Sequence, residues 1–270
     1  MNFYNADGDK SDRLINPTPG NPATLNLSQN VETSSFILMV IYGAKTKILN
    51  ANWGFMVIPT LNNSTANIAL DYFSNQTGAG NVRFRSNSWG LGDLYVQPIW
   101  LTWNTNKWTY SLTYGVWAPA GRYTAGDSKN VGLGYWSHNF RAAAKYKISP
   151  KWLAALAATY ELNSKQENVD FKEAPHLTLD YGLSYTMTKG HEVGFFGFYT
   201  KQTGDDAGTQ GSFLSDKFFG LGAYGSYWIK PGKYGALARA TQHFGATNRF
   251  AGISFQLGFN MLFLDLPKAQ

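Results

Sequence analysis

The side chains that most often carry out catalysis are few and scattered in this sequence. The chain has four histidines, which fall in different predicted strands: His138, His176, His191 and His243. No serine stands in a recognisable nucleophile motif, and no spacing of histidine and carboxylate residues is typical of a metal site. The acidic segments 7–9 and 204–206 could bind a divalent cation, but solvated loop tips account for them better. We therefore predict no enzyme, no cofactor and no metal.

A second set of polar side chains alternates with apolar ones along segments that resemble strands. The residues of this set that could line an enclosed interior are Asp93, Tyr95, Gln97, Arg141, Lys145, Lys147, Asp180, Arg239, His243, Gln256 and Asn260. Inside a small barrel such charges pair with one another and fix its shape, and we favour this role for most of them. The alternative is a polar constriction that orients the head group of an amphiphile.

Proline and glycine residues gather in and beside the predicted strand 89–103. They are Pro59, Gly90, Gly92, Pro98 and Pro119. Proline removes a ladder hydrogen bond and glycine permits bulges, so both weaken a continuous strand. Two interpretations are about equal: a device that curves the wall, or a lateral opening through which an apolar solute leaves the interior.

The composition indicates the elements that position these residues. Aromatic residues make up 16% of the chain and charged residues only 15%, whereas soluble proteins carry about a quarter of charged residues. No apolar run approaches the ~18 residues that a membrane-spanning helix needs. Residues 250–263 alternate between a largely polar and an apolar set, as strands with two unlike faces do. A sheet that is apolar outside and polar inside is typical of a barrel in a lipid bilayer.

The predicted strands and their connections support an up-and-down barrel. The twelve expected strands are 2–6, 31–43, 48–60, 89–103, 107–118, 134–147, 152–162, 175–187, 191–201, 215–229, 233–244 and 250–264. Tight turns at 43–47, 104–106, 149–151, 188–190 and 230–232 alternate with mostly longer connections at 7–30, 61–88, 119–133, 163–174, 202–214 and 245–249. This alternation predicts short periplasmic turns and longer extracellular loops on a transmembrane, antiparallel, all-β barrel. Strands 152–162 and 191–201 carry apolar residues on both faces, so they could place apolar groups inside.

The whole chain, 1–270, reads as a single outer-membrane β-barrel domain without an internal linker. We expect its first strand to be cut at the start and residues 265–270 to form a periplasmic tail. Cysteine is absent and the net charge is +6 without a basic stripe, which argues against nucleic acid as a partner. The expected partners are the lipid bilayer, lipopolysaccharide and a hydrophobic small molecule, and we expect a monomer in the outer membrane of a Gram-negative bacterium.

Six segments in chain order resemble the outer-membrane channels of the MetA-pathway of phenol degradation family. They are residues 2–14 (NFYNADGDKSDRL), 47–61 (KILNANWGFMVIPTL), 90–103 (GLGDLYVQPIWLTW), 115–123 (GVWAPAGRY), 176–187 (HLTLDYGLSYTM) and 193–206 (VGFFGFYTKQTGDD). The resemblance implies a twelve-stranded barrel that takes up hydrophobic molecules. In the family a segment before the first strand plugs the lumen, and we expect that plug to be missing here.

These observations together predict a channel for passive uptake of small hydrophobic or amphipathic compounds. We expect capture at aromatic outer loops around Phe73, Trp89 and Tyr123, and lateral exit through the wall near strand 89–103. The main alternative is a general porin for small hydrophilic solutes. Less favoured are an outer-membrane lipid hydrolase, for which His138 falls on the predicted outer face, and a purely structural or adhesive barrel.

Overall fold

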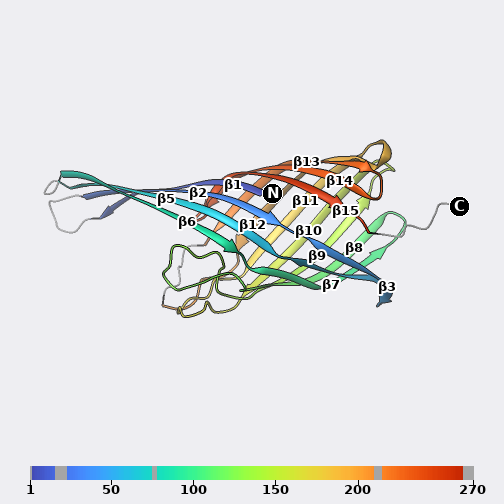
Figure 1. Ribbon diagram of the computed structural model, residues 1–270, viewed down its shortest axis with the longest axis horizontal. Helices are drawn as coiled ribbons and strands as arrows, with labels where there is room; N and C mark the ends of the chain where they lie inside the picture. Colours follow the sequence, from blue (N-terminus) through green and yellow to red (C-terminus); the bar gives the residue numbers. More distant parts are fainter. Residues whose placement is uncertain (1, 16–22, 75–77, 210–214, 264–270) are drawn as a thin grey trace.

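The computed structural model describes residues 2–15, 23–74, 78–209 and 215–263, which form one antiparallel sheet (Figure 1). Its strands are β1 (Asn2–Ile15), β2 (Ala23–Ile37), β3 (Val40–Ile48), β4 (Ala51–Ile58), β5 (Thr60–Ser74), β6 (Gly78–Leu91), β7 (Leu94–Asn104), β8 (Trp108–Ala118), β9 (Ser137–Lys147), β10 (Trp152–Asn163), β11 (His176–Thr186), β12 (Glu192–Gln202), β13 (Lys217–Lys230), β14 (Tyr234–Thr247) and β15 (Ala251–Met261). One 3₁₀ turn, η1 (Thr188–Gly190), joins β11 to β12. Within these ranges no helix is long and apolar enough to cross a membrane.

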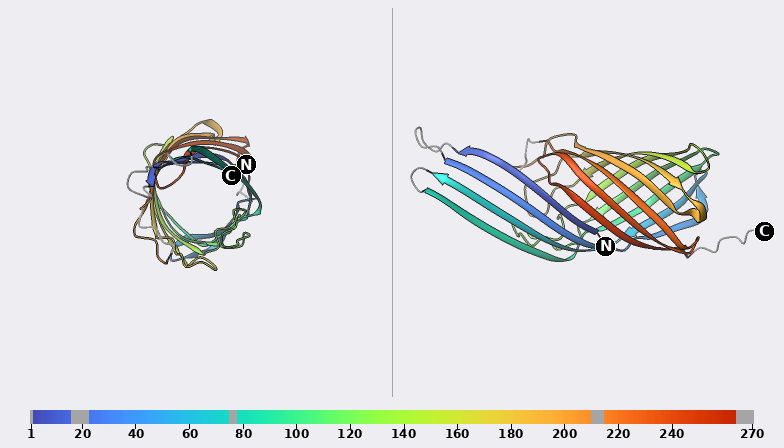
Figure 2. Two further views of the ribbon diagram at one scale, coloured as in Figure 1. Left: turned by 90° about the vertical axis from the view of Figure 1, so that its left-hand side faces the viewer. Right: turned by 90° about the horizontal axis from the view of Figure 1, so that it is seen from above.

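The fifteen strands make up a barrel of twelve, because six of them are consecutive pieces of three long strands. β2 continues into β3, β4 into β5 and β6 into β7, with breaks of only one or two residues. The ring is joined where Asn2–Asp7 of β1 pair with Ala251–Gln256 of β15. Beside this contact, in the described part of the chain, β3 and the end of β15 have a ladder partner on one side only. The end-on view shows the strands arranged in a ring (Figure 2), and the predicted transmembrane barrel is confirmed.

The outer face of the ring is apolar, as the alternation in the sequence predicts. On β15, Phe255, Leu257 and Phe259 point outward and remain about half exposed, although they are large hydrophobic side chains. In water such a surface would be unfavourable, but in a bilayer it meets acyl chains. Trp108 stacks on Tyr110 near one end of the wall, with 5.6 Å between ring centroids, as expected for an interfacial aromatic girdle.

The expected loops 7–30 and 61–88 were predicted wrongly, because most of their described residues are strands. β1, β2, β5 and β6 run far beyond the ring on the side of the long loops and form a four-stranded projection (Figures 1 and 2). Every described residue of β5 from Thr60 to Ser74 has a partner in β2, and backbone hydrogen bonds hold these strands although their side chains are largely polar. Residues 16–22 and 75–77 lie outside the described part of the chain.

Two further boundaries differ from the predictions. The first tight turn is not at 43–47 but at Leu49 and Asn50, which both have positive φ (52° and 61°), as a two-residue hairpin turn requires. The segment 43–47 of β3 is instead a bulge. The predicted strand 89–103 is not continuous, since it breaks between β6 and β7 at Gly92 and Asp93. The expected tail at 265–270 lies outside the described residues.

Candidate channel lumen and lateral gate

An ion pair between β9 and β11, which reaches across β10, marks the polar side of the lumen. Arg141 on β9 donates from Nη1 to Thr159 Oγ1 at 2.7 Å and to Asp180 Oδ2 on β11 at 2.5 Å. Both charged side chains are a third or more exposed, so water screens the pair and its contribution to stability is small. The ion pair instead places a dipole of fixed direction inside the barrel. Pairing between interior charges is the role that we favoured from the sequence for these residues.

The register brings the other predicted lumen residues to the same inner face, with one exception. Arg239 lies between Tyr224 and Gln256 in adjacent strands, and Asn260 lies opposite Gly235. Further members of this inner face are Lys145, Lys147 and His243, and also Tyr95, whose hydroxyl donates to Gln97 Oε1 at 3.2 Å. These residues are spread around the ring and do not form one cluster.

The exception is Asp93, whose carboxylate holds the loop 119–136. Oδ1 accepts from the backbone N–H of Gly121 at 3.0 Å and Oδ2 accepts from that of Leu133 at 2.8 Å. The side chain is buried, and the loop folds back over the inner face of the wall, where Ser86 Oγ bonds Ser128 at 3.0 Å. Asp93 therefore anchors a loop at the mouth and does not project into open space.

Replacing Asp93 with alanine is expected to loosen this loop. A hydrogen bond to a charged group is worth about 2 kcal/mol, so losing the pair should raise local opening roughly thirtyfold or more. Protease cleavage within 119–136 in intact cells measures this opening. Asp93→Asn keeps one acceptor oxygen and should lie between wild type and Asp93→Ala; equal cleavage of all three would contradict the anchoring role.

An aromatic wall, which the predicted lumen residues do not include, lines the inner face of β12 to β14. Its rings are Phe196, Phe198, Phe218 and Tyr224, with the imidazole of His243 against them. Phe198 lies 5.4 Å from Phe218 and 5.7 Å from His243, measured between ring centroids. The expectation that segment 191–201 places apolar groups inside is thereby confirmed. The guanidinium of Arg239 covers the Phe196 ring at 3.8 Å.

Two glycines allow these rings to lie flat against the strands. Phe198 is paired with Gly220 and Phe196 with Gly222, and a Cβ at either glycine would overlap the opposing ring. The paired spacing of glycines on β13 opposite two phenylalanines on β12 was the available signal in the sequence. It was missed because glycine is abundant throughout this chain.

The polar side and the aromatic wall meet around a cavity of about 280 Å³. Its lining includes Arg141, Lys145, Asp180, Phe196 and Tyr224. The Tyr224 hydroxyl donates to Glu192, so its ring is fixed at the cavity wall. A small molecule in this space would meet charged groups on one side and ring faces on the other.

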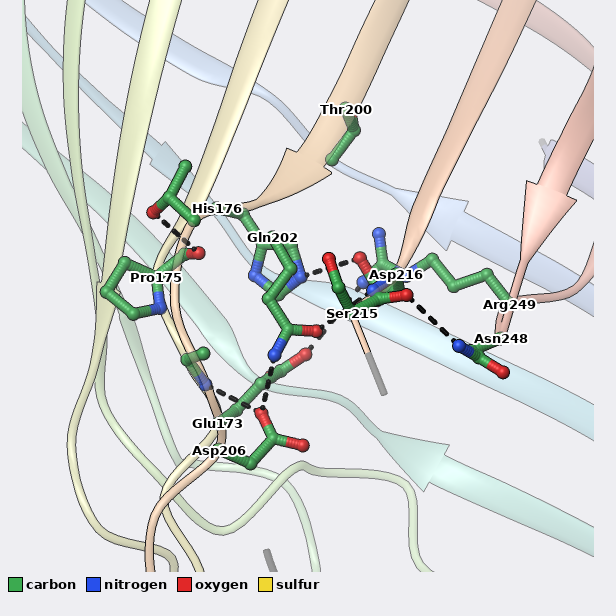
Figure 3. A network of polar contacts seen from close by, with 12 residues as sticks. Glu173, Pro175, His176, Thr200, Gln202, Asp206, Ser215, Asp216, Asn248 and Arg249 are labelled. Carbon is green, nitrogen blue, oxygen red and sulfur yellow. Dashed lines mark hydrogen bonds and ion pairs between the residues drawn. The ribbon is translucent and has the colours of Figure 1, made fainter. Parts of the chain in front are cut away.

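At the loop end of the barrel a polar network ties four separate segments together (Figure 3). His176 Nε2 bonds Asp216 Oδ1 at 3.0 Å, and Arg249 Nε donates to Asp216 Oδ2 at 2.9 Å. Glu173 lies 3.9 Å from Arg249 and accepts from the hydroxyl of Tyr135. Burial and the adjacent Glu173 carboxylate raise the pKa of the Tyr135 phenol, so it remains a donor at neutral pH.

Three members of this network, Glu173, Asp216 and Arg249, were not singled out from the sequence. Glu173, His176 and Asp216 bring ligand atoms within 4.8 Å of one another, a spacing that could hold a metal ion, but the Arg249 guanidinium already supplies the positive charge there. Asp206 belongs to the same network, since it accepts from the Ala174 N–H at 2.9 Å and from Gln202 Nε2 at 3.2 Å. The interpretation of Asp206 as a solvated tip was therefore wrong.

The residues predicted as a lateral gate lie together in three adjacent parts of the wall. Pro59 separates β4 from β5, Gly92 separates β6 from β7, and Pro119 follows β8. Gly90 is within β6, with φ of 155°. Pro98 lies on β7, where the register shifts against both neighbours, β4 and β8. The wall is thus irregular here, which fits both a curvature device and an opening.

His138, the candidate for lipid hydrolysis, faces outward among aromatic rings. Its Nδ1 shares a hydrogen bond of 2.9 Å with the hydroxyl of Tyr114, and the two rings stack at 6.1 Å. The partner is therefore a tyrosine in a membrane-facing cluster that also contains Phe140. This is the setting of an interfacial aromatic residue.

The family described as "Putative MetA-pathway of phenol degradation" matches residues 11–259. The chain belongs to this family. It shares its fold with the COG4313 outer membrane channel from Pseudomonas putida F1, with a TM-score of 0.59 and 12% identity over 96% of this chain and 93% of that one. The CymD monoaromatic hydrocarbon channel aligns with a TM-score of 0.43 and 10% identity over 97% of this chain and 87% of that one. No curated protein matches the chain.

Family membership and the barrel fold agree with the resemblance seen in the six segments, which is thereby confirmed. A transmembrane barrel with short turns at one end and long loops at the other is the architecture of Gram-negative outer-membrane proteins. The chain is accordingly an outer-membrane β-barrel of this family, and the expected localisation is confirmed.

Proposed function

We propose that this family member is an outer-membrane channel for the passive uptake of small hydrophobic or amphipathic compounds, with simple aromatics as the first class to test. The observation that carries the proposal is the aromatic wall of β12 to β14 inside the barrel. An aromatic solute gains stacking contacts from ring faces in the lumen, which the passage of small ions does not require. The family description, which refers to phenol degradation, points to the same class.

The cavity beside the aromatic wall suits a molecule with one polar end. A phenol in this space could stack its ring near Phe196 while its hydroxyl reaches the charged groups of Arg141 or Asp180. Its volume, about 280 Å³, is close to the lower end of the range of small-molecule sites. Transport needs no energy source, since a solute consumed inside the cell diffuses down its gradient.

Uptake by intact Gram-negative cells tests the function directly, because lipopolysaccharide blocks apolar solutes and pure lipid does not. Cells that contain the channel should take up radiolabelled toluene and phenol at low concentration several-fold faster than cells without it. In planar bilayers the purified protein should give small or no steady ion conductance. Large, steady conductance without faster toluene uptake would favour the general porin and contradict the proposal.

We also propose that the solute leaves the barrel sideways, between β7 and β8. The support is local: Pro98 has no N–H for the ladder, and the register shifts on both sides of it. The strand is broken again at Gly92, only a few residues before Pro98. Fewer ladder bonds make local separation of these two strands less costly than separation of two strands with an uninterrupted ladder. A lateral route delivers an apolar solute into lipid and avoids the aqueous periplasm.

A further inference from the structure

The projection beyond the ring inverts the polarity of the wall. It consists of residues 8–15, 23–29, 68–74 and 78–84, the parts of β1, β2, β5 and β6 that lie beyond the closing contact of β1 with β15. We call it the projecting sheet. In the membrane the outer face is apolar, but on β6 the outward residues above Trp89 are Asn87, Arg85 and Arg83. Asn87 Nδ2 donates to Asn63 Oδ1 at 3.2 Å on this outer face.

The inner face of the projecting sheet is apolar instead. Ile68 pairs with Phe84 and Leu70 pairs with Val82, so the four side chains form two adjacent rows on β5 and β6. Tyr72 continues the rows outward and lies across Gly80. Val82 is 55% exposed, Phe84 50% and Tyr72 40%, so the protein leaves much of their surface open.

This apolar face leads directly into the barrel. The same strands and the same side of the sheet continue from Phe84 to Ser86, where loop 119–136 is attached, and then into the ring. The outer face at this height carries two arginines and suits water or lipopolysaccharide. The apolar inner face is open to the surroundings and continuous with the lumen. A solute that enters the barrel from the outside would therefore meet this face first.

The size of the described face favours a small molecule over a protein. A stable protein interface buries ~800 Å² on each partner. The five side chains of this face are only partly exposed, from intermediate values at Ile68 and Leu70 to 55% at Val82, and together they offer much less. One aromatic ring, by contrast, needs only a few apolar side chains on one side to gain from contact.

We propose that the inner face of the projecting sheet, formed by Ile68, Leu70, Tyr72, Val82 and Phe84, is the first binding surface for a small apolar solute, which it holds before passage into the barrel. This inference rests on the proposed uptake function and specifies where capture takes place. It replaces the expected capture site, because Phe73 and Trp89 lie on the outer face and Tyr123 packs over Gly134.

The test uses two double variants whose positions alternate along one strand. Val82→Thr with Phe84→Ser makes the inner face polar, and Arg83→Thr with Arg85→Ser changes the outer face by the same number of residues. Initial rates of radiolabelled toluene uptake are measured in intact cells over a range of concentrations. Heat-modifiable electrophoretic migration checks that each barrel is folded, and the single variant Phe84→Thr serves if the inner double variant does not fold.

The inner variant should raise the half-saturating toluene concentration about five- to tenfold and leave the maximal rate unchanged, because capture is lost but the passage is intact. The outer variant should match wild type. An unshifted half-saturating concentration in the folded inner variant, or a loss of maximal rate alone, would overturn this inference and leave the proposed function standing. Wild-type cells without faster uptake than cells lacking the channel would overturn both.

Discussion

A disulfide between β7 and β8 beside Pro98 is expected to slow the uptake of apolar solutes roughly tenfold or more. Val96 and Val116 face each other in the ladder immediately before the bulge. Directly opposed residues in such a ladder have the spacing that a disulfide needs, and the chain has no cysteine of its own that could compete. If solute leaves by separation of these strands, the covalent bond of Val96→Cys/Val116→Cys closes the route, and reductant should restore uptake.

A matched crosslink on a regular part of the wall provides the control. Ala142 and Ala158 are opposed on β9 and β10, where the register is uninterrupted, so Ala142→Cys/Ala158→Cys stiffens the barrel without touching the bulge. Uptake of toluene by intact cells should not respond to oxidation in this variant. Equal rates for oxidised and reduced Val96→Cys/Val116→Cys would show that β7 and β8 need not separate, and the Pro98 bulge would then serve only to curve the wall.

The barrel itself was predictable because a bilayer imposes a pattern that each strand repeats. Phe255, Leu257 and Phe259 alternate with Ser254, Gln256 and Gly258, and no soluble environment requires that order over so many strands. Backbone groups in lipid must all be paired, so the alternation also implies a closed ring. For the same reason the regular turns between strands could be located to within a few residues.

The projecting sheet escaped prediction because it lies outside the bilayer, where that pattern no longer applies. On β5, Ile68 and Leu70 occupy the inner face, whereas apolar residues of the membrane part occupy the outer face. The change of the apolar face from outside to inside, together with polar residues such as Asn62 and Asn63, makes segment 61–88 resemble a loop in the sequence. The turn at Leu49 was missed for a different reason, because leucine rarely adopts a positive φ.

Within the site, single residues were easier to predict than their partners. Alternation alone places Arg141 and Asp180 on the inner face, but their ion pair reaches across β10, which separates β9 from β11. The polar network at the loop end of the barrel could not be inferred from the sequence. Its members come from four distant connections, whose relative positions depend on loop conformation: Tyr135, Glu173, Asp216 and Arg249. Short-range sequence patterns carry no information about such long-range contacts between side chains.

Removing the aromatic wall is expected to have an effect as large as closing the lateral route. Phe196→Ser with Phe198→Ser deletes two ring faces from the lumen, and an aromatic contact is worth about 1 kcal/mol, so toluene uptake at low concentration should fall roughly thirtyfold. The glycines opposite these rings, Gly220 and Gly222, leave no side chain that could fill the space. The same variant should therefore conduct ions better than wild type in planar bilayers.

Toluene uptake should fall in the serine variant while its ion conductance rises. These opposite changes distinguish an apolar path from a general porin. Phe196→Tyr with Phe198→Tyr keeps both rings and should retain most of the toluene uptake and the low conductance. In Phe196→Ser/Phe198→Ser the Arg239 guanidinium loses the ring that it covers at 3.8 Å, so the added conductance should prefer anions. If the serine variant took up toluene faster as its conductance rose, the rings would be obstacles, and the lumen would have to be understood as a narrow porin.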